Sequence, residues 1–127
     1  MISAISTIYM AMKKYIYDAI VVDVYDGDTC TAIIDLGMGV SIKKKIRLSG
    51  INAPEKRGVD EKTKEKAEKS KEYLEKRILN KKILIHSLKK GKFGRLIAKI
   101  WVYDDEGNTT EESINEELLR KGLADIY

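Results

Sequence analysis

Residues 16–48 read IYDAIVVDVYDGDTCTAIIDLGMGVSIKKKIRL, and the prediction of the fold starts from this stretch. β-branched and apolar residues dominate 16–24 and again 29–36, and the turn-forming Asp26-Gly27-Asp28 separates the two runs, which predicts a β-hairpin. From 40 to 49, apolar residues alternate with polar ones apart from one lysine, which indicates a strand with one buried face. The sequence therefore predicts three consecutive strands.

The rest of the chain predicts a helix, two more strands and a second helix. Residues 62–79 contain neither Pro nor Gly and carry an apolar stripe at helical spacing, with Lys and Glu elsewhere. Strands are predicted over 83–88 and 96–102, and Ser113-Ile114-Asn115-Glu116 matches a capping box that starts a short helix ending near Gly122. Five short strands with a helix before the last two suit a small OB-like barrel, and an open α+β sheet is the alternative.

Length and composition fit one compact domain. The chain has 127 residues, of which 43% are hydrophobic and 35% charged, enough apolar side chains for a core. One Cys and one His exclude an intrachain disulfide and an ordinary zinc site, so any metal must bind to oxygen. The formal net charge of +4 is too small to identify a polyanionic partner by itself.

The first residues do not match a targeting signal. Residues 1–14 are fairly apolar, but Lys13-Lys14 follows the apolar run instead of preceding it, and no small-residue cleavage site is evident. The run is also too short to cross a bilayer. We expect 1–14 to be a poorly ordered N-terminal lead-in, 15–127 to be the folded domain, and the location to be cytoplasmic with no membrane association.

Three loop segments carry the residues suited to chemistry. Asp26-Gly27-Asp28-Thr29 places carboxylates at a turn that can hold Ca²⁺ or Mg²⁺, although Asp-Gly is also a common hairpin turn. Pro54, the only proline, stiffens the loop that presents Glu55. Arg47 lies in the predicted strand before the Glu55 loop, and Arg95 lies at the start of the last predicted strand. Their planar guanidinium groups suit phosphate oxygens. Together these residue types indicate phosphoryl chemistry.

The joint order of DGDT, IRLSGINAPE, FGR and ESINEELLRKGLA resembles the staphylococcal-nuclease-like (thermonuclease) family from about Ile16 to Tyr127. The resemblance implies an α+β fold, a five-stranded OB-type β-barrel with two main packed helices. It also implies a calcium-dependent phosphodiesterase that cuts DNA and RNA.

The resemblance assigns roles to six positions. A metal-binding aspartate is implied at Asp28, and the general base at Glu55. Asn52 stands where the family's prototype has a second metal-binding aspartate; an amide oxygen can bind Ca²⁺ but adds no charge, so weaker metal binding is expected. The implied positions are Arg47, Glu55 and Arg95 for catalysis, and Asp28, Asn52 and Ala53, the last through its carbonyl, for the metal.

The sequence thus predicts a metal-dependent phosphodiesterase, a thermonuclease-like endonuclease of low sequence selectivity acting on DNA and/or RNA. Lys92 and Phe93, beside Arg95, are predicted to contact substrate as phosphate contact and base platform. We expect a monomer with no obligate protein partner. One alternative is a noncatalytic OB-type nucleic-acid-binding barrel. The other is a degenerate nuclease fold that serves as a protein-interaction module, and Asn52 is the feature that most favours this second alternative.

Overall fold

The computed structural model describes residues 14–127, so the predicted lead-in lies outside the described residues except for Lys14. The elements, in chain order, are β1 (Ile16–Asp26), β2 (Thr29–Gly37), β3 (Val40–Leu48), β4 (Ile51–Asn52), α2 (Glu61–Ile78), β5 (Lys82–Lys90), the 3-10 turn η1 (Lys92–Gly94), β6 (Leu96–Val102), α3 (Ile114–Arg120) and β7 (Asp125–Ile126). The five predicted strands and the two predicted helices are all present.

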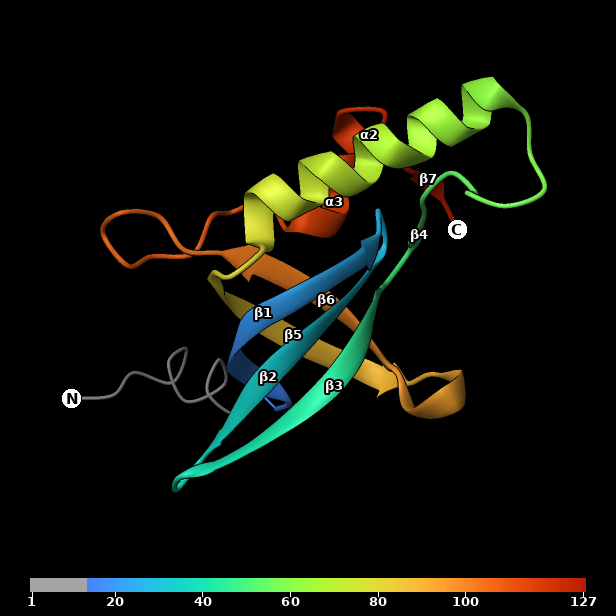
Figure 1. Ribbon diagram of the computed structural model, residues 1–127. Helices are drawn as coiled ribbons and strands as arrows, with labels where there is room; N and C mark the ends of the chain where they lie inside the picture. The colour runs from blue at the N-terminus through green and yellow to red at the C-terminus, as the bar shows by residue number, and fades with distance from the viewer. Residues whose placement is uncertain (1–13) are drawn as a thin grey trace.

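Five strands form a closed barrel in the order β1-β2-β3-β6-β5, with α2 and α3 packed at one end (Figure 1). Neighbouring strands are antiparallel except β3 and β6, which pair in parallel with Arg47 opposite Ile97. The predicted α+β OB-type barrel is confirmed, and the alternative of an open sheet is wrong. Closure occurs where residues 46–48 of β3 pair with residues 96–98 of β6.

A second, two-stranded sheet was not predicted. In it β4 pairs with β7, so that Ile51 lies opposite Ile126 and Asn52 opposite Asp125. Beyond this pair, the Tyr127 backbone N–H donates to the Gly50 carbonyl at 3.0 Å. These contacts bring residues 125–127 beside the segment that leads from β3 to Glu55.

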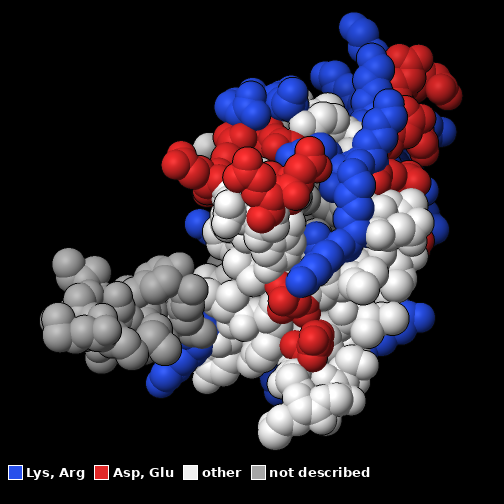
Figure 2. Space-filling view, turned by 90° about the vertical axis from the view of Figure 1, so that its left-hand side faces the viewer, with Lys and Arg blue, Asp and Glu red and all other residues white. Residues whose placement is uncertain are grey.

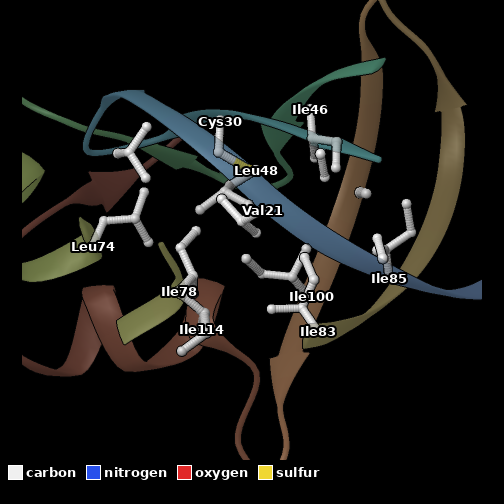
Figure 3. Close-up of a cluster of buried hydrophobic side chains, with 14 of the residues drawn as sticks. Val21, Cys30, Ile46, Leu48, Leu74, Ile78, Ile83, Ile85, Ile100 and Ile114 are labelled. Atoms are coloured by element: carbon white, nitrogen blue, oxygen red, sulfur yellow. The ribbon is translucent and has the colours of Figure 1, made fainter. Parts of the chain in front are cut away.

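The core fills the barrel and continues beneath α2 (Figure 3). Val21, Ile46 and Ile100 from the strands meet Leu74 and Ile78 from the helix, and all five are fully buried. Burying each such side chain contributes about 1.5–3 kcal/mol, so α2 is held mainly by its apolar stripe. This packing holds α2 in place at one end of the barrel.

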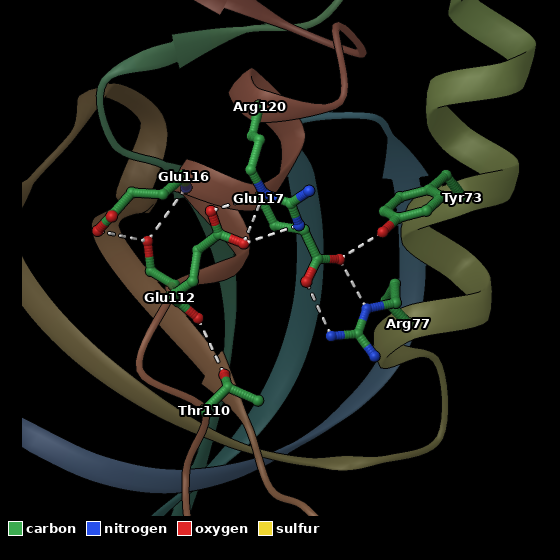
Figure 4. A network of polar contacts seen from close by, with 8 residues as sticks. Tyr73, Arg77, Thr110, Glu112, Glu116, Glu117 and Arg120 are labelled. Atoms are coloured by element: carbon green, nitrogen blue, oxygen red, sulfur yellow. Dashed lines mark hydrogen bonds and ion pairs between the residues drawn. The ribbon is translucent and has the colours of Figure 1, made fainter.

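Caps and one polar cluster fix the two helices. Asp60 accepts the Thr63 N–H at 2.8 Å to cap α2, and Ser113 accepts the Glu116 N–H at 3.1 Å to cap α3, as the predicted capping box requires. The Glu117 carboxylate of α3 joins the two helices, because it accepts a hydrogen bond from an arginine of α2 (Figure 4). Capping and this contact together set how α3 sits against α2.

Charged side chains of both signs share the surface with uncharged ones (Figure 2). Figure 2 shows groups of basic and acidic residues side by side on one face, so this face is not a uniformly basic surface. Within residues 14–127, no helix combines the length and apolar character needed to span a membrane.

Candidate nucleic-acid-cleaving site

A pocket of about 790 Å³ lies where the β1–β2 turn, the end of β3, the segment after β4 and the start of β6 meet. Segments far apart in the sequence thus contribute to one concave surface, as is typical of ligand sites. The pocket collects all six residues with predicted catalytic or metal-binding roles, which are Asp28, Arg47, Asn52, Ala53, Glu55 and Arg95.

Asp28 is held by the turn and by the loop opposite. Its Oδ1 accepts the Thr29 hydroxyl at 2.9 Å, and its Oδ2 accepts the Ala53 N–H at 2.8 Å. Gly27 is required beside it for space, because a Cβ there would lie 2.7 Å from the Ser70 Cβ and 2.9 Å from the Ala53 Cβ. The turn therefore packs directly on α2, and only 8% of Asp28 is exposed.

Arg47 links the two predicted metal-binding side chains. Its Nη2 donates to the Asn52 Oδ1 at 2.6 Å and lies 3.4 Å from the Asp28 Oδ2. Its Nη1 donates to the Leu48 carbonyl at 2.9 Å, and the Tyr127 ring centroid is 5.8 Å from the guanidinium carbon. These contacts place the planar donor fork at the pocket wall.

Arg95 precedes β6, and the parallel pairing of β3 with β6 brings it near Arg47. Its Nε donates to the Lys92 carbonyl at 3.3 Å, so the η1 turn orients it. Glu55 is exposed and follows Pro54 along the pocket lining. Two cations and one accessible carboxylate thus face the same space.

The two predicted substrate contacts, Lys92 and Phe93, belong to the η1 turn that precedes Arg95. Lys92 is exposed in η1 and is not among the residues that line the pocket, so the site prediction and the pocket differ at this position. Phe93 also belongs to η1, and its side chain lies outside the described part of the structure. Lys92 is connected to the pocket through its carbonyl, which accepts the Arg95 Nε.

Asp26 is a site residue that sequence reasoning did not assign. Its Oδ1 accepts the Asp28 N–H at 3.0 Å, and its side chain lines the pocket. Burial, together with the neighbouring Asp28 carboxyl, raises the pKa of Asp26 to about 6. The only signal in the sequence was its place in the acidic turn.

The oxygen atoms at this end of the pocket suit a hard cation. Within residues 14–127, no three His, Cys, Asp or Glu side chains converge as a metal cluster. The predicted set, however, consists of one carboxylate (Asp28), one amide oxygen (Asn52) and a backbone carbonyl (Ala53), which are ordinary Ca²⁺ ligands. The residues therefore fit Ca²⁺ in ligand type, with less negative charge than two aspartates would supply.

Comparison with known proteins gives the same family as the motifs. Residues 45–127 match the family described as staphylococcal nuclease homologue. Over 82 residues, 65% of this chain, the sequence is 32% identical to a probable endonuclease of Schizosaccharomyces pombe and 27% identical to the probable endonuclease LCL3 of Komagataella phaffii. The matched part spans 36% and 35% of these relatives, about a third of their length. The family match covers more than half of the chain, and the chain therefore belongs to the staphylococcal nuclease homologue family.

Proposed function

We propose that this protein is a calcium-dependent nuclease that hydrolyses phosphodiester bonds in DNA and/or RNA by internal cutting, with low sequence selectivity. The observation that carries the proposal is the single pocket that holds Asp28, Arg47, Glu55 and Arg95. Family membership supports it, as do two relatives that are named probable endonucleases. A pocket lined by three arginines and two lysines suits a negatively charged substrate whose charge increases during reaction.

The two arginines bind and stabilise the phosphate. Arg47 is held by its contacts with Leu48 and Asn52, and Arg95 by its contact with Lys92, so both guanidinium groups are oriented before substrate binds. Fixed donors of this kind stabilise charge that develops on phosphorus oxygens as water attacks in line. Glu55, which is exposed in the same pocket, orients the water and accepts its proton.

Asp28, Asn52 and the Ala53 carbonyl would hold Ca²⁺. When bound, the ion supplies a positive charge that polarises a phosphoryl oxygen. Within the chain, the Ala53 N–H holds the Asp28 Oδ2 at 2.8 Å, which keeps the carboxylate pointed at the pocket. Asp26 adds a second acidic group close by.

A test of this function uses Arg95→Ala and Glu55→Gln on labelled single-stranded DNA in Ca²⁺ and in EDTA. Each variant should cut on the order of 10²–10³-fold more slowly than the wild type, because each loses one preorganised group, and EDTA should abolish cutting. Arg120→Ala and Glu106→Gln, at exposed positions of α3 and the β6–α3 loop, serve as matched controls and should cut normally. Wild-type rates in both site variants would contradict the proposal.

A degenerate nuclease fold that has lost metal-dependent cleavage and serves as a protein-interaction module is the second candidate, and the feature that favours it is Asn52. Its Oδ1 already accepts Arg47 at 2.6 Å, and it adds no charge toward a metal. The same DNA, incubated with and without Ca²⁺, separates the candidates. The nuclease cuts it, a noncatalytic nucleic-acid-binding barrel binds it without cutting, and the protein-interaction module does neither.

A further inference from the structure

The Tyr25 ring lies at the rim of the pocket and is not part of the core. Tyr25 lines the pocket, and 49% of the residue is exposed, whereas its neighbour Val24 is buried. The Tyr25 ring is therefore accessible to a ligand that enters the charged pocket.

A β-bulge is the reason for its position. In the pairing of β1 with β2, Val24 lies opposite Cys30 and Asp26 lies opposite Thr29, so Tyr25 is an extra residue with no Cα partner. Bulges redirect side chains and recur next to active sites. Here the bulge leaves Asp26 and Asp28 at the pocket while Tyr25 reaches its rim.

Two lysines from other segments meet the Tyr25 ring. The Lys56 Nζ lies 4.3 Å from the ring centroid and donates to the Tyr25 carbonyl at 2.7 Å. The Lys45 Nζ lies 5.6 Å from the centroid, and both lysines line the pocket. Lys56 follows Glu55 directly, and Lys45 lies two residues before Arg47 on the same side of β3. The aromatic ring is thus next to the groups proposed to act on phosphate.

We propose that Tyr25, Lys45 and Lys56 form a nucleobase subsite, which rests on the proposed nucleic-acid substrate. The Tyr25 ring stacks on the base of a nucleotide adjoining the phosphate held by the arginines. Lys45 and Lys56 neutralise that nucleotide's own phosphate. Stacking on an aromatic ring is tolerant of base identity, which suits a site without base-edge readout.

The test compares two ligands of equal charge and length, oligo(dT) and an abasic deoxyribose-phosphate oligomer, by fluorescence anisotropy in EDTA. The wild type should prefer oligo(dT). Tyr25→Leu should bind oligo(dT) about 5- to 100-fold more weakly and lose the preference, while Tyr25→Phe, which keeps the ring, should retain it. Lys45→Ala should weaken the binding of both ligands by the same factor, since it removes a phosphate contact and no stacking surface.

The outcomes separate this subsite from the proposed hydrolase. If Tyr25→Leu prefers oligo(dT) over the abasic oligomer as strongly as the wild type does, the proposed subsite is refuted, even if the protein cuts DNA normally in Ca²⁺. If the wild type prefers oligo(dT) through Tyr25 but never cuts, the subsite stands and the hydrolase fails. If the wild type binds neither ligand, or binds both equally, the subsite is also overturned. Circular dichroism of Tyr25→Leu checks that the barrel persists.

Discussion

A single guanidinium group connects the parts of the site. Arg47 contacts the Asn52 amide oxygen, the Asp28 carboxylate and the Leu48 carbonyl, and it faces the Tyr127 ring. The oxygens proposed to hold a metal are therefore already neighbours of a fixed positive charge. In the proposed metal site, Ca²⁺ would share the Asn52 oxygen with Arg47, which makes residue 52 the most informative position to change.

Asn52→Asp should tighten Ca²⁺ binding by about tenfold or more, because a second carboxylate attracts a divalent cation more strongly than an amide does. Part of the gain is offset because the new carboxylate also attracts Arg47. The measurement is calorimetric titration with calcium alone, without nucleic acid. Asn108→Asp makes the same charge change in an exposed loop and should leave the affinity unchanged. Equal affinity in Asn52→Asp and the wild type would remove residue 52 from the metal site.

At single positions, sequence reasoning identified the pocket residues that stand in motifs of fixed order. It missed the pocket residues whose position depends on an irregular backbone. Asp28, Glu55 and Arg95 each stand in a motif of fixed order, and the structure places them in one pocket. Tyr25 and Lys56 stand beside those motifs, but their meeting depends on a bulge in β1 and a loop contact. Neither the bulge nor the loop contact leaves a periodic signal, so residue types alone could not reveal this pair.

At the scale of elements, α2 and α3 are joined by a polar cluster. The Glu117 carboxylate accepts two hydrogen bonds from Arg77, at 2.7 and 2.9 Å, and one from the Tyr73 hydroxyl at 2.5 Å (Figure 4). Burial alone would raise the pKa of Glu117, but the Arg77 and Tyr73 contacts outweigh burial and hold the pKa below its usual value. The cluster ties α3 to the helix that also packs on the Asp28 turn.

Arg77→Met should lower the free energy of unfolding by about 1–3 kcal/mol at neutral pH, since it leaves the largely buried Glu117 carboxylate without its cation. The contribution has a definite pH sign. Folding lowers the pKa of Glu117, so its stabilisation is fully present above the ordinary value of 4.5 and is lost as pH falls through the lower folded pKa. Urea unfolding over a series of pH values should show the gap between the two proteins narrowing in acid.

Arg120→Met removes the exposed pair with Glu112 and is the matched control, with a smaller expected effect. A gap between Arg77→Met and the wild type that stayed constant down to the most acidic pH would assign the stabilisation to packing of the arginine stem instead.

Elements with a clear period were predicted within one or two residues, whereas the short ones were not. The strand predicted over 96–102 is β6 as observed, and the helix predicted over 62–79 is α2 shifted by one residue. By contrast, β4 and β7 are two residues each, too short to show alternation. Their pairing depends on how the chain returns after α3, a tertiary contact that no local pattern encodes.

For the molecule as a whole, sequence order alone did not determine closure. Five strands with an inserted helix suited a barrel or an open sheet, and the parallel pairing of β3 with β6 decides for the barrel. The same pairing brings Arg47 and Arg95 together, so the fold and the candidate site depend on one long-range contact. The pocket lining holds charges of both signs, so the formal charge of the pocket is +2 while that of the chain is +4. The five cations of the lining are Lys45, Arg47, Lys56, Arg57 and Arg95, and its three carboxylates are Asp26, Asp28 and Glu55.

Binding of single-stranded DNA should therefore weaken steeply with salt. If three to five of the pocket cations contact phosphates, the logarithm of the binding constant should fall against log[KCl] with a slope of about −2 to −3.5. Lys45→Ala should reduce that slope by about 0.7, whereas Lys76→Ala, at an exposed position of α2 away from the pocket, should not. Binding titrations at a series of KCl concentrations measure this slope. A binding constant that does not change with KCl would mean that phosphates are not the main contact.

The tight contact at Gly27 also limits how this sequence can drift. A methyl group at position 27 would overlap both Ser70 and Ala53, so no single compensating substitution makes room for it. An alanine there becomes tolerable only when both neighbours have already become glycine, and each of those changes weakens α2 or the loop on its own. Positions 27, 53 and 70 are therefore constrained as a set, although they belong to a turn, a loop and a helix that are far apart in the sequence.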